Sequence, residues 1–234
     1  MNRVLEVATS VGAMLPRALS GSKVGTLGER PKLALELWEY EGCPYCRKVR
    51  EALSILDLDA VIYPCPKGGS HFREELKERA GKAQFPYLTD PNTGKEMYES
   101  DDIVRYLFET YGDGRVPFLL AAGPLTDLTS ALASAWRPVQ GMHYEPSKPP
   151  ESLLELYSFE ASPFCRLARE VLCSLEIPYL LHNVAKGSPR REAYIARSGK
   201  MMVPYLVDPN TNTEMFESAD IVSYLRGTYG ESKA

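Results

Sequence analysis

The chain contains the same unit twice, and this duplication constrains its fold more than any other feature of the sequence. Of the 27 positions from Pro86 to Gly112, 19 are identical in the segment from Pro204 to Gly230. Further upstream Cys46 aligns with Cys165, with one residue fewer in the middle of the second copy. Each copy has the length of a small domain. We therefore expect two domains of one fold, residues 1–115 and residues 116–234.

A weaker similarity extends the repeat toward the N-terminus. The matched residues are Leu5, Thr9, Ser10, Ala13 and Arg17 with Leu125, Thr129, Ser130, Ala133 and Arg137. We expect a short amphipathic helix at the start of each unit, at about Glu6–Leu15 and Leu125–Trp136. Residues 1–20 are also poor in acidic residues, as organellar transit peptides are. Their place in the repeat favours a part of the fold over a targeting leader.

Each unit shows the same alternation of strand and helix patterns. The first unit predicts strands at Leu33–Tyr40, Ala60–Pro64, Tyr87–Thr89 and Glu96–Tyr98, and helices at Cys46–Leu56, Ser70–Ala80 and Ser100–Tyr111. The second unit predicts the corresponding elements at Leu153–Phe159, Cys165–Leu175, Tyr179–Asn183 and Pro189–Arg197, followed by the same hairpin and helix. The first part of each unit requires a right-handed parallel crossover, and the turn at 90–94 favours a hairpin. This order predicts the α/β class, with two tandem thioredoxin folds, each preceded by a short helix.

Composition excludes several classes of function. The net charge is −4 and the basic residues are dispersed, so we expect no nucleic-acid partner. No apolar run approaches the roughly 18 residues of a transmembrane helix. Five cysteines with a single Cys-x-x-Cys pair match neither a secreted disulfide framework nor a paired-cysteine zinc site. We expect no metal, and a reducing compartment.

The motif most directly linked to chemistry is Cys43-Pro44-Tyr45-Cys46, between a predicted strand and a predicted helix. The start of a helix favours a thiolate, and the thiolate is the form that attacks disulfides. Cys46 is spaced to resolve a mixed disulfide on Cys43. A pair of inert buried cysteines is the alternative. Cys65 follows the second strand and either approaches this site or is packed in the core.

Three further features recur in both copies. Phe85-Pro86 precedes the hairpin, where thioredoxin folds have a cis proline whose neighbour pairs with an extended peptide; an ordinary proline at a strand start is the alternative. Glu99-Ser100 opens the last helix, where a serine cap and free N–H groups suit a carboxylate. Lys67 precedes a glycine, and its cation is placed to pair with a second carboxylate of the same ligand. The last two features also occur in plain helix caps and surface turns.

Together these motifs resemble a glutaredoxin combined with the N-terminal domain of glutathione S-transferases. The tandem arrangement resembles a family of duplicated transferase N-terminal-domain proteins of photosynthetic organisms. The resemblance implies Cys43 as nucleophile and a chloroplast stroma or cytoplasmic location. It also implies glutathione binding through Tyr45, Lys67, Phe85, Pro86, Glu99 and Ser100.

Two departures from these families limit the interpretation. No all-helical domain follows either unit, so conjugation of bulky electrophiles is doubtful. The second unit has Ser162 at the nucleophile position, which cannot form a mixed disulfide but can hydrogen-bond a glutathione thiolate. Cys165 is expected to be a small buried residue. The other second-unit equivalents are Lys186, Val203, Pro204, Glu217 and Ser218.

The resulting hypothesis is a glutathione-dependent thiol–disulfide oxidoreductase that acts on protein disulfides or glutathionylated proteins through Cys43. The second unit would bind glutathione or serve as a scaffold. Two alternatives remain open. One is a transferase or isomerase that uses the groove between the units, and the other is a non-enzymatic glutathione-binding or assembly protein.

Overall fold

Two copies of one strand and helix order make up the computed structural model, which describes residues 3–12, 17, 19–121, 123, 128–130 and 140–231. The first copy comprises β1 (Leu35–Glu39), α2 (Pro44–Ile55), β2 (Ala60–Pro64), α3 (Phe72–Ala80), β3 (Tyr87–Asp90), β4 (Lys95–Met97) and α4 (Ser100–Tyr111). The second comprises β5 (Leu154–Ser158), α7 (Pro163–Ser174), β6 (Tyr179–Asn183), α8 (Arg191–Ser198), β7 (Tyr205–Asp208), β8 (Thr213–Phe216) and α9 (Ser218–Tyr229). Helices α1 (Arg3–Gly12) and α5 (Phe118–Ala121) precede these copies.

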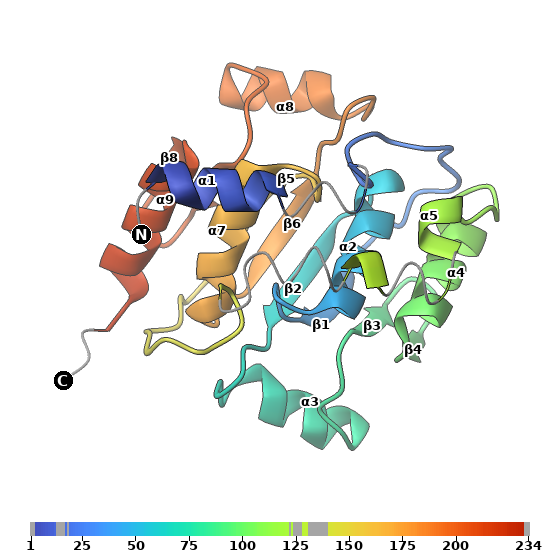
Figure 1. Ribbon diagram of the computed structural model, residues 1–234, viewed down its shortest axis with the longest axis horizontal. Coiled ribbons are helices and arrows are strands. Elements are labelled where there is room, and N and C mark those ends of the chain that lie inside the picture. The colour runs from blue at the N-terminus through green and yellow to red at the C-terminus, as the bar shows by residue number, and fades with distance from the viewer. Residues whose placement is uncertain are drawn as a thin grey trace.

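The strands of both copies form one continuous sheet of order β4-β3-β1-β2-β6-β5-β7-β8 (Figure 1). Within each copy the first two strands are parallel, and the hairpin is antiparallel to them. The copies meet where β2 pairs with β6 in antiparallel register, with Val61 opposite Leu180. The sheet order reads the same from both ends, so the copies are related by a pseudo-twofold axis at this pair. The junction also pairs two strands that would otherwise be exposed edges.

The predicted α/β class and the two thioredoxin folds are confirmed, with small shifts at element ends. Helices α2 and α7 begin at Pro44 and Pro163, rather than at the cysteines expected to open them. Proline suits the first helical position because it has no N–H to leave unpaired there. The expected helix at Glu6–Leu15 is observed as α1, with both bounds three residues earlier. Most of the helix expected at Leu125–Trp136 lies outside the described residues. Only its residues 128–130 are described, and these are helical.

Side chains alternate between two differently covered faces of the sheet. Leu35 and Leu37 of β1 point to one face, where they join a core shared by both copies under α2, α4, α7 and α9. Trp38 points to the other face and packs with Phe72 of α3, while α8 covers an equivalent cluster in the second copy. The larger core therefore runs across the junction and ties the copies together.

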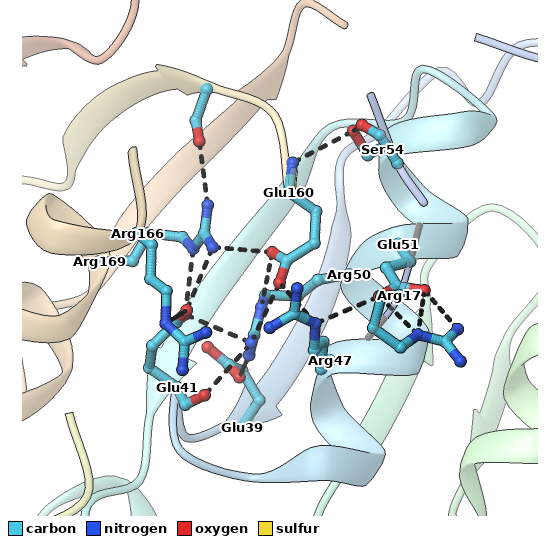
Figure 2. A network of polar contacts seen from close by, with 12 residues as sticks. Arg17, Glu39, Glu41, Arg47, Arg50, Glu51, Ser54, Glu160, Arg166 and Arg169 are labelled. Atoms are coloured by element: carbon cyan, nitrogen blue, oxygen red, sulfur yellow. Dashed lines mark hydrogen bonds and ion pairs between the residues drawn. The ribbon is translucent and has the colours of Figure 1, made fainter. Parts of the chain in front are cut away.

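Buried ion pairs also cross the junction, as Figure 2 shows. Arg50 of α2 contacts Glu160, which follows β5, with 3.0 Å between Nε and Oε2. Reciprocally, Arg169 of α7 contacts Glu41, which follows β1, again with 3.0 Å between Nε and Oε2. Arg169 also reaches Glu160 at 2.9 Å. All four side chains are at most 2% exposed, so the desolvation of each charge is offset by partners from both copies.

The first helix packs on the second copy. Helix α1 contacts α7, and the Ser10 hydroxyl donates to the Pro163 carbonyl at 2.8 Å. Arg17 in turn donates to the Thr129 hydroxyl at 2.9 Å. The predicted domain boundary at residues 115 and 116 stays a prediction, because segments on either side of it are interleaved in space.

Removing one charge from this cluster tests how far the fold depends on it. We expect Arg169→Met to lower the free energy of unfolding by about 3–5 kcal/mol, because Glu41 and Glu160 lose a guanidinium in a buried site. Urea unfolding at neutral pH measures this. Arg226→Met is the control, since Arg226 forms an exposed pair with Glu145, and should cost less than about 1 kcal/mol. Equal effects of the two substitutions would contradict the prediction.

Candidate functional site

Cys43 occupies the N-cap of α2, directly after the turn that follows β1. Its backbone has φ −79° and ψ 122°, and its sulfur accepts a hydrogen bond from the N–H of Cys46 at 3.3 Å. The Cys43 N–H donates to the carbonyl of Tyr40 at 3.0 Å, which closes the turn. The strand-to-helix junction therefore directs the sulfur at the unpaired amides of the helix start.

The pKa values of the two thiols of the motif are shifted in opposite directions. The thiol of Cys46 donates to Cys43, and together with the N–H groups of Cys46 and Tyr45 it lowers the pKa of Cys43 to about 7 against the effect of burial. Burial raises the pKa of Cys46 well above its ordinary value, and the hydrogen bond to Cys43 adds to this. At neutral pH Cys43 is therefore partly a thiolate and Cys46 is a neutral thiol, which is the division expected for a nucleophile and a resolving group.

The pair is shielded from solvent. Cys43 is 2% exposed and Cys46 is fully buried, whereas Tyr45 between them is about half exposed, at 48%. Residues 140–142 lie against the preceding glycine, so a Cβ on Gly42 would be 3.2 Å from the methyl carbon of Met142. The low dielectric of such a site strengthens the hydrogen bonds that hold the thiolate.

The peptide bond before Pro86 is cis, as expected, and so is the bond before Pro204. The Phe85 ring packs edge-on against Tyr40 at 6.0 Å between centroids, and the Arg73 guanidinium lies 4.8 Å from the Phe85 ring centre. Within the described part of the chain, no hydrogen bond uses the backbone N–H or carbonyl of Phe85. These groups are available to an extended peptide.

The expectation that Ser100 caps α4 is wrong. Glu99 holds the N-cap position and Ser100 is the first helical residue. Glu99 has φ 66° and ψ 112°, a region that non-glycine residues rarely adopt, and Glu217 repeats it with φ 64° and ψ 114°. The Glu99 carboxylate is exposed and accepts from the Gln84 amide at 2.6 Å, so it does not cap the helix. Within the described ranges no side chain caps the first amides of α4 at this strained corner, and such amides suit a ligand carboxylate.

Lys67 and Lys186 are held by the segment that precedes the opposite copy. Lys67 exchanges backbone hydrogen bonds with Met142 and Tyr144, at 2.6 and 2.9 Å. Lys186 does the same with Ser22 and Val24, at 3.0 and 2.9 Å. Both lysine side chains are exposed. Their positions are therefore fixed by both copies, although each lysine belongs to one.

The second copy reproduces the backbone of the site without its nucleophile. Ser162 is the N-cap of α7 and accepts from the N–H of Cys165 at 3.2 Å, as Cys43 does in the first copy. Cys165 is fully buried, as expected. Glu217 and Ser218 open α9 in the same way as their counterparts open α4. Val203 and Pro204 form the equivalent cis bond.

Sequence reasoning missed two residues beside the thiols. The Tyr40 hydroxyl lies within hydrogen-bonding distance of Cys43. Burial and the two thiols raise the pKa of Tyr40. Glu39, buried at the end of β1, adds to the raised pKa of Cys46. The sequence could have drawn attention to both residues, because the second copy has Ser158 and Phe159 at the positions of Glu39 and Tyr40. Cys65 instead lies in the core cluster under α3.

A cavity of about 620 Å³ lies elsewhere, where residues 29–33 meet Asn92, Thr93, Thr110 and Tyr111. Neither Cys43 nor Ser162 lines it. Among the described residues, no group of three or more His, Cys, Asp or Glu side chains is placed to hold a metal ion. In the same ranges, no helix combines the length and apolar character needed to cross a membrane.

Comparison with known proteins agrees with this geometry. The family model described as "Glutathione S-transferase, N-terminal domain" matches residues 37–120 and 156–233. The chain belongs to this family. A search of the curated proteins finds no match.

Among solved structures, this glutathione S-transferase N-terminal-domain protein is similar to Leishmania TDR1, described as a unique trimeric glutathione transferase. The identity is 16%, over 86% of this chain and 68% of that chain, with a TM-score of 0.29. A TM-score this low supports no inference from that protein. The family itself is established by the sequence match to both copies.

The acidity of Cys43 is directly measurable. We expect iodoacetamide to modify Cys43 with a midpoint near pH 7, because hydrogen bonds outweigh the effect of burial on its pKa. Cys65, Cys165 and Cys173 should resist, because burial outweighs the other effects and raises the pKa of each thiol. Cys46→Ala should move the midpoint upward, because the Cys46 thiol is the largest contributor to the lowered pKa. Mass spectrometry of tryptic peptides across pH 5–9 gives both values. An ordinary thiol midpoint, unaffected by Cys46→Ala, would contradict this.

Proposed function

We propose that this protein is a glutathione-dependent thiol–disulfide oxidoreductase with Cys43 as its nucleophile. The observation that carries the proposal is the Cys43 sulfur at the start of α2, with a pKa near 7, in the same copy as the cis Phe85–Pro86 bond. A thiol of this acidity is both ionised and nucleophilic at neutral pH. The family match supports glutathione as the ligand class.

The described residues fit glutathione. The unused backbone groups of Phe85, next to Pro86, suit the backbone of its cysteine, as in β-strand addition. The free amides at Ser100 suit the γ-glutamyl carboxylate, and the exposed Glu99 carboxylate suits the ammonium. Lys67 supplies an exposed cation for the glycyl carboxylate. Tyr45, exposed beside the motif, completes the proposed binding set.

The proposed reaction begins when the Cys43 thiolate attacks a glutathionylated or disulfide-bonded substrate. The sulfur–sulfur bond of the substrate breaks, one thiolate leaves, and Cys43 is held in a mixed disulfide. Either glutathione or Cys46 then attacks this mixed disulfide and frees Cys43 or forms the Cys43–Cys46 disulfide. The substrate disulfide is reduced and the attacking thiols are oxidised, so the electrons balance.

For the second copy we propose glutathione binding or a scaffolding role without disulfide chemistry. Ser162 can donate a hydrogen bond to a glutathione thiolate, with Lys186, Val203, Pro204, Glu217 and Ser218 as the equivalent binding groups. The same serine supports the competing proposal of a transferase, because stabilising a thiolate is what conjugation requires. Turnover of a small electrophile, lost in Ser162→Ala and kept in Cys43→Ser, would favour that alternative. We place the protein in a reducing compartment, the chloroplast stroma or the cytoplasm.

Activity toward a glutathionylated peptide tests the main proposal. Cys43→Ser should lower turnover by at least about 100-fold because the nucleophile is lost. Cys46→Ser should retain much of it, because glutathione can still resolve the intermediate. Cys165→Ser, the equivalent of Cys46 in the second copy, is the matched control and should be unchanged. Activity that survives in Cys43→Ser would overturn the proposal.

A further inference from the structure

The two copies differ at the residues that surround their helix starts. Glu39, Tyr40 and Cys43 in the first copy correspond to Ser158, Phe159 and Ser162 in the second. The backbones are the same, so the first copy has gained, or the second has lost, a carboxylate together with the nucleophilic thiol. Glu39 is therefore associated with the chemistry of the thiols and is not a requirement of the fold.

Glu39 belongs to the buried network of arginine and glutamate side chains at the junction of the two copies (Figure 2). Its side chain is 2% exposed and pairs with Arg50. Arg50 also contacts Glu41 and Glu160, at 3.4 and 3.0 Å. In the second copy Arg169 donates to the Ser158 hydroxyl at 3.3 Å, where Arg50 has a carboxylate. Glu160 and Glu41 each have a further arginine, Arg47 and Arg166, at 3.9 Å, whereas within the described residues the ion pair of Glu39 is with Arg50 alone.

Glu39 is the member of this group that can hold a proton near neutral pH. Burial raises the pKa of Glu39 to about 7, which Arg50 opposes and the charges of Glu41 and Glu160 reinforce. Burial acts in the same direction on Glu41, but the charges of Arg169 and Arg50 outweigh it and lower the pKa of Glu41 to about 2. The two neighbouring carboxylates therefore differ in protonation across the neutral range.

Cys46 needs a proton acceptor inside the protein. Its sulfur is fully buried and interacts with the N–H of Tyr40, the residue after Glu39. Cys46 and Arg50 are four residues apart on α2, so both project from one face of the helix toward the end of β1. The ion pair of Arg50 with Glu39 brings the carboxylate to that face. Solvent does not reach Cys46, so an internal base is required to ionise it.

We propose that Glu39 accepts the proton of Cys46 when Cys46 resolves a mixed disulfide on Cys43. The proton passes from the Cys46 sulfur to the Glu39 carboxylate. The Cys46 thiolate then attacks the Cys43 sulfur, the Cys43–glutathione bond breaks, glutathione leaves as a thiolate, and the Cys43–Cys46 disulfide forms. This inference rests on the proposed function, since it requires the mixed disulfide.

The pH dependence follows from the groups around Glu39. Facing groups are Arg50 and Cys46 on α2, Arg169 and Cys173 on α7, Tyr179 on β6, and Glu41, Cys65 and Glu160 on the loops after strands. The base form of Glu39 becomes populated as pH rises through its pKa of about 7. The rate of resolution by Cys46 should therefore rise through pH 7 and then level off.

Single-turnover release of glutathione from protein preloaded at Cys43 tests this inference. Glu39→Gln should slow release at pH 7 by at least about tenfold, and the rate should continue to climb above pH 8 instead of levelling. Glu39→Asp should restore part of the rate. Glu39→Ser places the second copy's own residue at this position and provides a second variant if Glu39→Gln does not fold. Ser158→Ala is the control, and its rate and profile should match the wild type.

A second background separates proton transfer from a structural effect. In Cys46→Ser, where added glutathione resolves the adduct, Glu39→Gln should change turnover less than about twofold, because no proton of Cys46 is moved. Equal slowing in both backgrounds would overturn the inference, as would a Glu39→Gln profile identical to the wild type. If the wild-type protein forms no Cys43 adduct, the proposed function itself fails. If the adduct forms and Glu39→Gln releases glutathione at the wild-type rate, only the inference about Glu39 fails.

Discussion

The structure depends on the reciprocal exchange of charges across the junction between β2 and β6. Arg50 reaches Glu160 and Arg169 reaches Glu41, so each copy buries a guanidinium that pairs with carboxylates of both copies. A buried charge left alone destabilises a protein strongly, whereas a paired one is close to neutral. These ion pairs between the copies form only in the mutual orientation that also builds the continuous sheet and the shared core.

The same cluster lies directly behind the thiols, which couples the assembly of the two copies to the chemistry of one. Arg50 helps to lower the pKa of Cys43 and also pairs with Glu39. Glu160, from the other copy, adds to the charge that keeps Glu39 close to protonation at neutral pH. The acidity of the first site is thus set partly by residues of the second copy, in which Ser162 stands at the position of Cys43.

Divergence between the copies separates what the fold requires from what the site requires. The hairpin aspartate that recurs makes the same structural contacts in both copies. Asp90 accepts hydrogen bonds from the hydroxyls of Tyr106 and Tyr111, and its counterpart Asp208 accepts them from the equivalent tyrosines. Cys43 and Glu39, by contrast, recur as serines. The copies thus share these structural contacts and differ at the proposed nucleophile and at the carboxylate behind it.

The sequence by itself determined the duplication, the thioredoxin order of each unit and the cysteine motif, because these depend on local pattern and spacing. The cis bond before Pro86 was expected only through the likeness to thioredoxin folds. The sequence did not reveal that Glu99 rather than Ser100 holds the cap of α4, since an unusual backbone conformation leaves no pattern in residue types. Only the tertiary structure decided that Arg50 meets Glu160, 110 residues away in the chain, and that Glu39 lies beside them. Electrostatic energies depend on distance and burial, and neither exists until the two copies have packed together.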